Sequence, residues 1–263
     1  MSRVAAIRAP LFVPADRPER FEKAAASGAD AIILDLEDAV APDRKVQARN
    51  NLRVDFTDLP VIVRINAVGT PWCEQDLAAV AQLAVAAIMA PKVESEHDLA
   101  RLNESPARHH RQIALIETAR GLDQARNLAG KFRIDRLAFG SVDFAADIGC
   151  AHERMALLHA RSEIVLASRL GGISAPLDGV TTVIDQPEAA ADDAAHARAL
   201  GFGGKLCIHP RQIEPVLGAF RPSAQEVAWA QRVLASGDGA VSVDGAMVDE
   251  PVRLRARRIV ARV

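Results

Sequence analysis

Cysteine is scarce in this chain of 263 residues, and neither sign of charge dominates. The three cysteines, Cys73, Cys150 and Cys207, lie far apart and form no CxxC pair. Their odd number and wide spacing argue against a disulfide framework or a structural zinc site and suit a reducing cytoplasm, where we expect the protein. Lys and Arg number 32 against 34 Asp and Glu, so the net charge is −2. This balance gives no sign of a nucleic-acid-binding surface or a polybasic membrane patch.

Long hydrophobic runs are missing as well. The longest, Leu83–Pro91, is preceded by Gln82 and is too short to span a bilayer. Arg8 and Pro10 interrupt the N-terminal apolar stretch, so we expect no signal peptide and no membrane association. The 16 glycines and 14 prolines are too few for a low-complexity chain. With 49% hydrophobic and 25% charged residues, the composition is that of a soluble globular protein.

Short apolar strands and helical segments alternate along most of the chain. Runs such as AIILDL, VIVRI and IALIE are continuously apolar, which is typical of strands covered on both faces of a parallel sheet. The first predicted strand starts at residue 9 and the eighth at residue 204, so seven units span 195 residues, about 28 each. The predicted strands are Ala9–Pro14, Ala31–Leu36, Val61–Ile65, Ala87–Ala90, Ile113–Glu117, Arg136–Gly140, Ala175–Val183 and Gly204–Ile208.

Eight units of this size favour an α/β fold of the (β/α)₈ TIM-barrel type, which takes roughly 250 residues. We assign residues 1–220 to this catalytic barrel. A doubly wound open sheet is the alternative, but neither GxGxxG nor GxxxxGK[ST] occurs.

The alternation stops beyond about Pro210. Residues 221–263 form a predicted extension with a helix at Ala224–Ala235, a small hairpin marked by DG turns at 238–239 and 244–245, and a basic helix from Val252. Barrel closure does not require this extension, so we predict a lid or oligomerisation segment. A helix packed on the barrel exterior is an equally open interpretation.

Two carboxylates are predicted at the carboxyl ends of adjacent strands, where barrel enzymes carry their catalytic groups. Glu117 ends the fifth predicted strand, in IETARG, and Asp143 follows the sixth, in GSVD. Two oxygen ligands without a nearby Cys or His cluster fit Mg²⁺, which completes its octahedron with waters and substrate oxygens. The sequence therefore predicts a Mg²⁺ site. The alternative is that each carboxylate caps a helix or pairs with a neighbouring cation.

Arg64 lies within the third predicted strand, in VIVRINA, where a buried guanidinium needs a partner. A substrate carboxylate at the barrel mouth would satisfy its planar donor fork in a bidentate pair. An internal acid such as Asp35 or Glu37 is the alternative partner. The predicted site thus combines a divalent ion and an arginine, both directed at an oxygen-rich small acid.

Lysines and histidines support competing interpretations. Lys92 ends the fourth predicted strand, in MAPK, and a lysine there can form a Schiff base with a carbonyl substrate. Lys205 starts the eighth strand, at the end of the barrel that serves stability. His209, in CIHP, is the one histidine placed to meet a ligand, although packing or loop hydrogen bonding is the more ordinary role. His109–His110, in a polar Arg-rich linker, are expected on the solvated surface.

Seven segments carry a resemblance that runs nearly from end to end in one register. They are LFVPADRPERFEKA at 11–24, DAIILDLEDAVAPDRKVQAR at 30–49, VRINAVGTPW at 63–72, IETARGL at 116–122, FGSVDFAADIG at 139–149, GKLCIHPRQI at 204–213 and GAMVDEPVRLRARRIV at 245–260. Together they resemble the HpcH/HpaI aldolase and citrate lyase β-subunit family, in its CitE-like branch. An end-to-end resemblance is far more specific than any single motif.

The resemblance implies a Mg²⁺-dependent barrel that makes or breaks a carbon–carbon bond between an acyl thioester and a 2-oxo acid. By position, Glu117 and Asp143 match the family's metal ligands, and Arg64 matches the arginine that grips the oxo-acid carboxylate. Asp249, in MVDEP, resembles the acidic catalytic residue that relatives deliver from the C-terminal segment, often onto a neighbouring subunit's site. Val142 stands where many CitE-like members have an acid, a departure that we expect to tune the pocket without removing the metal.

The resemblance also assigns residues to substrate binding. These are Leu11, Phe12, Arg17 and Lys23 near a CoA or acyl-carrier arm, Ile208 and His209 as a further lining pair, and Gly140, Ser141 and Glu117. The implied partners are a CoA or acyl-carrier thioester, a small 2-oxo acid, and further copies of the chain in a trimer or hexamer. Solvated surface is the alternative for Arg17 and Lys23.

The expected activity is that of a lyase acting on a citryl, malyl or citramalyl thioester. Four alternatives stay open: a malyl-type thioesterase, a CoA-free aldolase, a Schiff-base aldolase using Lys92, and a non-catalytic subunit of a larger lyase complex.

Overall fold

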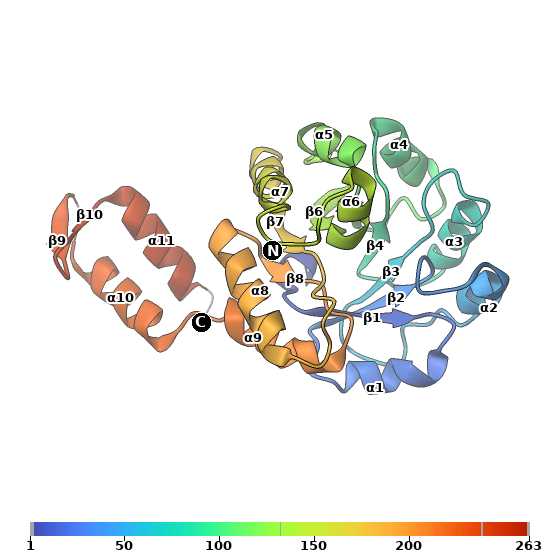
Figure 1. Ribbon diagram of the computed structural model, residues 1–263, viewed down its shortest axis with the longest axis horizontal. Coiled ribbons are helices and arrows are strands. Elements are labelled where there is room, and N and C mark those ends of the chain that lie inside the picture. The colour runs from blue at the N-terminus through green and yellow to red at the C-terminus, as the bar shows by residue number, and fades with distance from the viewer. Residues whose placement is uncertain (1–2, 132, 238, 262–263) are drawn as a thin grey trace. The chain divides into compact units, whose positions relative to one another are not determined.

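The computed structural model describes residues 3–131, 133–237 and 239–261 (Figure 1). The chain divides into two compact units, Met1–Leu217 and Gly218–Val263. The first contains a parallel sheet of eight strands, and the second contains helices and a two-stranded antiparallel sheet. Within these described ranges, no helix combines the length and the apolar character that crossing a bilayer would need.

The eight strands of the first unit follow one another in chain order, and each pairs in parallel with the next. The sheet closes where Leu11 forms a parallel bridge with Cys207, and the Phe12 amide donates to the Cys207 carbonyl at 2.9 Å. The predicted TIM barrel is therefore confirmed. Its strands are β1 (Pro10–Pro14), β2 (Ala31–Asp35), β3 (Val61–Arg64), β4 (Ala87–Ala90), β5 (Gln112–Ile116), β6 (Ile134–Phe139), β7 (Ser174–Asp178) and β8 (Gly204–Lys205).

The last two strands are shorter than predicted, because the segments that follow them are bound to a buried glutamine. The Gln212 amide donates to the carbonyls of Thr181, at 2.7 Å, and Val183, at 3.3 Å. Its Oε1 accepts from the amides of Ile208 and His209. Backbone groups of Thr181, Val183, Ile208 and His209 therefore bond one side chain, which ties together two loops at the carboxyl end of the barrel.

Apolar side chains fill the barrel interior, so it is a packed core and not a pore. Ile33, Ile62, Met89 and Ile113 are fully buried there. At the amino end of β6, Arg136 is also completely buried. The Arg136 guanidinium donates to three backbone carbonyls, those of Val4, Ile7 and Ala175. These bonds close the base of the barrel around a cation.

Helices of the first unit follow the strands and surround the sheet (Figure 1). They are α1 (Phe21–Ala25), α2 (Lys45–Asn50), α3 (Cys73–Val80), α4 (Glu96–Glu104), α5 (Ala119–Leu128), α6 (Ser141–Ile148), α7 (Leu158–Leu170) and α8 (Pro187–Leu200). The chain passes from the first unit to the second within α9 (Ile213–Phe220). Capping side chains fix where several of these helices begin. Ser95 and Asp98 form a capping box at α4, and the Thr118 hydroxyl accepts from the Gly121 amide at α5.

The second unit consists of α10 (Ala224–Ala235), β9 (Val241–Val243), β10 (Ala246–Val248) and α11 (Glu250–Val260). The predicted hairpin is present, and Asp244 and Gly245 form its turn, both with positive φ. Asp238, of the other DG pair, lies outside the described residues. α11 begins at Glu250, earlier than predicted, because the Asp249 carboxylate accepts from the Val252 amide and caps the helix.

Candidate active site

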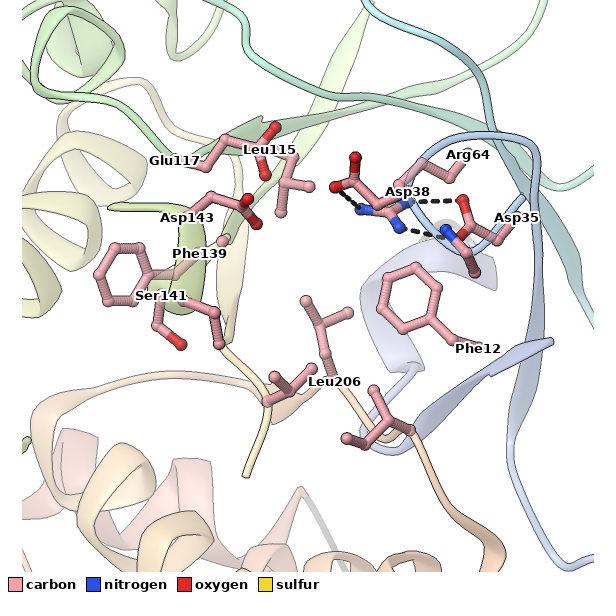
Figure 2. Close-up of a pocket in the computed structure, with 15 residues that line it drawn as sticks. Phe12, Asp35, Asp38, Arg64, Leu115, Glu117, Phe139, Ser141, Asp143 and Leu206 are labelled. Atoms are coloured by element: carbon pink, nitrogen blue, oxygen red, sulfur yellow. Dashed lines mark hydrogen bonds and ion pairs between the residues drawn. The ribbon is translucent and has the colours of Figure 1, made fainter. Parts of the chain in front are cut away.

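A cavity of about 340 Å³ lies at the carboxyl ends of the barrel strands (Figure 2). Seven predicted site residues line it: Phe12, Arg64, Glu117, Gly140, Ser141, Asp143 and Ile208. The other lining residues are Asp35, Asp38, Ala39, Leu115, Phe139, Val142, Val180 and Leu206. Charged groups from β2, β3 and β5 thus meet an apolar floor formed in part by Leu115 and Leu206.

Arg64 is held on one side of this cavity by an internal acid. Parallel register puts Asp35, the last residue of β2, opposite Arg64, the last residue of β3. The Asp35 carboxylate accepts from Arg64 Nε and Nη2, both at 2.7 Å. Burial alone would lower the pKa of Arg64, but the Asp35 charge raises it above its ordinary value. Both internal partners considered from the sequence are therefore found, because Glu37 Oε2 also lies 2.9 Å from Arg64 Nη1. One further N–H on each of Nη1 and Nη2 remains for a ligand.

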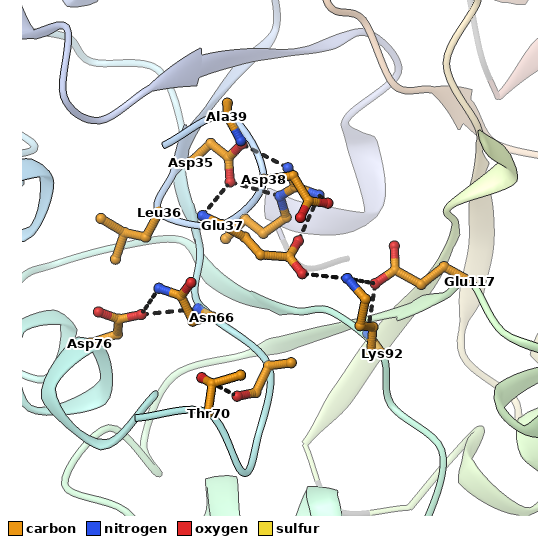
Figure 3. A network of polar contacts seen from close by, with 12 residues as sticks. Asp35, Leu36, Glu37, Asp38, Ala39, Asn66, Thr70, Asp76, Lys92 and Glu117 are labelled. Atoms are coloured by element: carbon orange, nitrogen blue, oxygen red, sulfur yellow. Dashed lines mark hydrogen bonds and ion pairs between the residues drawn. The ribbon is translucent and has the colours of Figure 1, made fainter. Parts of the chain in front are cut away.

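The loop after β2 is fixed by the same carboxylate and by a buried lysine. Asp35 also accepts from the amides of Glu37 and Ala39. Lys45 Nζ donates to the carbonyls of Leu36, at 2.7 Å, and Glu37, at 2.8 Å. Because these contacts hold the backbone on both sides, the Glu37 side chain has a defined direction. It points toward Arg64 Nη1 and toward Lys92, and Figure 3 shows the contact with Lys92.

Glu117 follows β5 and is 1% exposed. Its Oε1 accepts from the Lys92 amide at 2.8 Å, whereas its Oε2 is buried without a hydrogen-bond partner among the described residues. Burial, together with the charges of Glu37 and Asp143, raises the pKa of Glu117 to about 8 against the opposing charges of Lys92 and Arg64. A buried carboxylate oxygen without a partner costs free energy, so this atom is suited to receive a ligand.

Asp143 approaches the same cavity from the first turn of α6, next to Gly140 and Ser141. Its charge acts on Glu117, which agrees with the two carboxylates lying close together in Figure 2. No group of three or more His, Cys, Asp or Glu suited to hold a metal occurs within the described ranges. Two carboxylates, one with an unpartnered oxygen, suit Mg²⁺ completed by water and substrate oxygens better than they suit zinc.

A chain of alternating charges connects Arg64 with Glu117, and Figure 3 shows Glu37, Lys92 and Glu117 of this chain. Glu37 Oε2 lies 2.9 Å from Arg64 Nη1, and Glu37 Oε1 lies 2.7 Å from Lys92 Nζ. Lys92 Nζ in turn lies 3.8 Å from Glu117 Oε1. Burial alone would lower the pKa of Lys92, but the hydrogen bond to Glu37 raises it above its ordinary value. A Schiff-base lysine needs the opposite shift, so this geometry disfavours the Lys92 aldolase.

Five other residues suggested by the resemblance lie outside the lining of this cavity or in the second unit. Leu11 is buried in β1. Arg17 and Lys23 are exposed cations after β1, and Arg17 pairs weakly with Glu19 at 3.8 Å. The His209 Nδ1 accepts from the Arg211 amide, which matches the loop hydrogen bonding considered from the sequence. Asp249 belongs to the second unit.

The sequence did not predict the contact that holds the Ser141 side chain in place. Its Oγ lies 2.9 Å from His152 Nε2, in the segment between α6 and α7. Gly179 packs so closely that a Cβ added there would lie 2.1 Å from Ser141 Oγ. No local pattern marks His152, because the two residues meet only after α6 has formed.

This barrel, with acidic residues at adjacent strand ends and an arginine beside them, defines an α/β-barrel protein suited to bind a divalent cation and an acid. The HpcH/HpaI aldolase/citrate lyase family matches residues 8–210. The chain therefore belongs to this family, and the predicted membership is confirmed.

Individual relatives extend the match to almost the whole chain. A citrate lyase subunit beta-like protein of Mycobacterium tuberculosis is 42% identical over 96% of this chain and 94% of its own length. A (3S)-malyl-CoA thioesterase of Cereibacter sphaeroides is 34% identical over 97% of this chain and 94% of its own length. The crystal structure of protein CitE from M. tuberculosis, in complex with magnesium, acetoacetate and coenzyme A, has a TM-score of 0.88 and 42% identity over 98% of both chains.

Proposed function

We propose that this chain is a Mg²⁺-dependent carbon–carbon lyase that cleaves or forms a 3-hydroxy-acid thioester. Its products in the cleavage direction are a 2-oxo acid and an acyl thioester. The observation that carries the proposal is that Glu117, with an unpartnered buried Oε2, lines one cavity with Asp143 and Arg64. The CitE protein of M. tuberculosis, 42% identical, is in complex with magnesium, acetoacetate and coenzyme A, and a citrate lyase beta subunit of the same organism is in complex with oxaloacetate and magnesium; both support the same ligand classes here.

Glu117 and Asp143 would hold the Mg²⁺ ion, which when bound polarises substrate oxygens as a Lewis acid. Arg64 binds the oxo-acid carboxylate through the N–H groups that Asp35 and Glu37 leave free. The ring of Phe12, 4.9 Å from its guanidinium carbon, limits how the arginine can turn. Because Arg64 is fixed on its far side, the oxo acid is bound in one orientation. Gly140 and Ser141 form the wall of the cavity beside Glu117, and the lack of a Cβ at Gly140 leaves room for that carboxylate.

Asp249 is the proposed acid/base. In cleavage, the bond between the hydroxyl-bearing carbon and the carbon next to the thioester carbonyl breaks. The hydroxyl proton passes to water, the electrons of the broken bond move to the thioester carbon, and Asp249 donates a proton to that carbon. Water then returns a proton to Asp249, so no proton is gained or lost overall. In synthesis, Asp249 removes the proton from the thioester carbon. We further propose that residues 221–263 act as a lid or oligomerisation segment that brings this carboxylate to a barrel site.

The acyl arm has its own proposed contacts. Arg17 and Lys23 are exposed cations that suit the phosphates of CoA or an acyl carrier, and Ile208, 40% exposed, offers an apolar contact at the mouth. Leu11 and His209 support this region from β1 and from the start of η4 (Pro210–Gln212). We also propose that the chain works in the cytoplasm as a homo-oligomer, a trimer or hexamer, which light scattering after size-exclusion chromatography tests.

A substrate screen tests the activity. Purified protein is incubated with citryl-, malyl- and citramalyl-CoA, with Mg²⁺ or with EDTA. We expect one substrate to give oxo acid and acyl-CoA in equal amounts, and only with Mg²⁺. Glu117→Gln, which keeps the side-chain shape, should abolish this turnover, whereas the exposed His97→Gln should not change it. Turnover in EDTA, or full activity after replacing both Glu117 and Asp143 with Ala, contradicts the proposal.

Thioester hydrolysis is the second candidate, favoured by the 34% identity to a (3S)-malyl-CoA thioesterase over nearly the whole chain. The two reactions differ in their products. Hydrolysis releases free CoA thiol and leaves the hydroxy acid intact, while the lyase reaction keeps the thioester and releases an oxo acid. A thiol reagent and an oxo-acid hydrazone assay on the same sample separate them. Absence of Mg²⁺ and thioester binding in calorimetry would instead indicate a non-catalytic subunit.

A further inference from the structure

Two separate atoms of Lys92 converge on the buried carboxylate of Glu117. The Lys92 backbone amide donates to Glu117 Oε1 at 2.8 Å, and Lys92 Nζ lies 3.8 Å from the same oxygen. The same ammonium donates to Glu37 Oε1 at 2.7 Å. Figure 3 shows Lys92 between the two glutamates, with the dashed contacts meeting at Glu117. Since both contacts use Oε1, the other carboxylate oxygen stays free.

The backbone of Lys92 adopts a conformation that lysine rarely takes. Its φ is +49°, and among the described residues other than glycine only Asp244 also has a positive φ. Asp244 forms a two-residue hairpin turn, which requires that conformation. Lys92 follows β4 and forms no hairpin, so local turn chemistry does not explain it. Unusual backbone of this kind persists where the surrounding structure holds it in place, and here the amide that it directs bonds Glu117.

The free oxygen of Glu117 is held from the other side as well. A Cβ added at Gly140 would lie 2.5 Å from Glu117 Oε2 and 2.5 Å from Glu117 Cβ, so this side chain passes close against the start of α6. With Oε1 bonded to Lys92 and Oε2 against Gly140, the carboxylate has one orientation. That orientation leaves Oε2 buried and unpartnered in a cavity that Asp143 also lines.

We infer that Lys92 is a positioning residue that prepares Glu117 to hold the metal, its amide by orienting the carboxylate and its ammonium by separating two like charges. Glu37 and Glu117 are both buried, and two carboxylates sharing a buried site repel each other unless a cation lies between them. Lys92 is that cation. This inference rests on the proposed function, because it assigns Lys92 a task in Mg²⁺ binding and excludes it from covalent chemistry.

Four variants distinguish the contribution of the Lys92 ammonium from that of the Lys92 backbone amide. Lys92→Arg keeps a cation and Lys92→Gln removes it, with no change in the demand on the backbone. Lys92→Gly removes the side chain but accepts a positive φ, whereas Lys92→Val removes it and disfavours that backbone strongly. The readout is the Mg²⁺ dissociation constant of the substrate-free protein, measured by calorimetry. The melting temperature in EDTA shows whether each variant folds.

Outer contacts of metal ligands typically contribute 10–100-fold to affinity, so we expect about tenfold weaker Mg²⁺ binding for Lys92→Gln and Lys92→Gly, and about 100-fold for Lys92→Val. Lys92→Arg should stay within about threefold of the native protein because it restores the cation. Asp244→Val, which strains the hairpin of the second unit, is the control: it should lower the melting temperature and leave Mg²⁺ affinity unchanged.

The outcomes distinguish failure of the proposed function from failure of this inference. If the native chain binds no Mg²⁺, the proposed function fails and this inference fails with it. If the native chain binds Mg²⁺ and folded Lys92→Gln and Lys92→Val bind it equally well, the proposed function stands and the positioning task of Lys92 is wrong. Equal losses in Lys92→Gly and Lys92→Val would also contradict the part assigned to the amide.

Discussion

Arg64 and Asp35 end neighbouring strands, and the carboxylate of one receives two 2.7 Å hydrogen bonds from the guanidinium of the other. This bidentate pair fixes the plane of the guanidinium, and Glu37 pairs with Nη1 at 2.9 Å. A lysine cannot reproduce it, because an ammonium is a point charge without a planar fork.

Arg64→Lys is therefore expected to weaken oxo-acid binding selectively. The apparent KM for the oxo acid in the synthetic direction should rise at least tenfold, as expected for loss of a charge-assisted hydrogen bond of roughly 1.5–3 kcal/mol, while the KM for the acyl thioester changes little. Steady-state kinetics with each substrate varied in turn provides the measurement. A parallel rise in both constants would show that Arg64 supports the fold of the site and not one substrate.

Gly140→Ala tests how tightly the cavity is built. The new Cβ would lie 2.5 Å from both Cβ and Oε2 of Glu117, so the carboxylate has to move. We expect Mg²⁺ affinity to fall at least tenfold, as for other disturbances around a ligand.

Gly218→Ala is the matched control, since a Cβ there meets nothing within 4 Å. Gly218 lies within α9, where Ala is preferred, so this variant should gain about 0.5–1 kcal/mol in unfolding free energy and keep native Mg²⁺ affinity. Calorimetry and urea unfolding measure the two effects. Native Mg²⁺ affinity in Gly140→Ala would show that Glu117 is free to turn.

Asp249 has a structural task that must be separated from its proposed chemistry. It caps α11, and Asn caps helices as well as Asp does, so Asp249→Asn should leave the unfolding free energy unchanged. Asn cannot accept a proton, so turnover should fall by about 10²–10⁴. Asp249→Ala should lose both the turnover and the helix cap, and loss of the cap should lower the unfolding free energy by about 1 kcal/mol. Full turnover in Asp249→Asn would limit this residue to capping.

His110 gives the stability a defined pH dependence. Its Nε2 contacts the Val80 carbonyl at 3.2 Å, and burial, with the neighbouring His109, lowers the pKa of His110 below its ordinary value of 6.5. The folded state therefore binds a proton less readily than the unfolded state. The stability that neutral, buried His110 contributes is complete above pH 6.5. It is lost as the pH falls through that value toward the pKa of His110 in the folded state.

His110→Gln should reduce the difference in unfolding free energy between pH 7.5 and pH 5.5, measured by urea denaturation. The exposed His97→Gln is its control and should leave that difference as it is. An identical pH profile in native protein and His110→Gln would assign the acid sensitivity to other groups.

His110 is also where sequence reasoning was wrong. The polar, Arg-rich surroundings predict solvent exposure, yet His110 is buried against Val80, thirty positions earlier in the chain. Local composition holds no information about such a distant neighbour. The strands were predictable because their buried faces appear as apolar runs in the sequence itself, and the ends of β7 and β8 were not, because the bonds that end them come from Gln212.

The candidate site was also predictable from the sequence only in part. Strand ends on adjacent strands predict that Glu117 and Asp143 face one cavity, since parallel strands carry their carboxyl ends to one edge. The sequence allowed two internal partners for Arg64, Asp35 and Glu37, and the structure shows both. Nothing in the sequence predicted the positive φ of Lys92, because lysine has no preference for that backbone conformation and the surrounding residues form no turn motif.

Arg136 closes the amino end of the barrel by donating to carbonyls of the N-terminal segment and β7, and the packed apolar core separates it from the cavity at the carboxyl end. Under the proposed function, a small oxo acid beside Arg64 and Glu117 would therefore enter and leave on the side where the thioester binds. We then expect the oxo acid to bind first and to leave last, and product-inhibition patterns test this order.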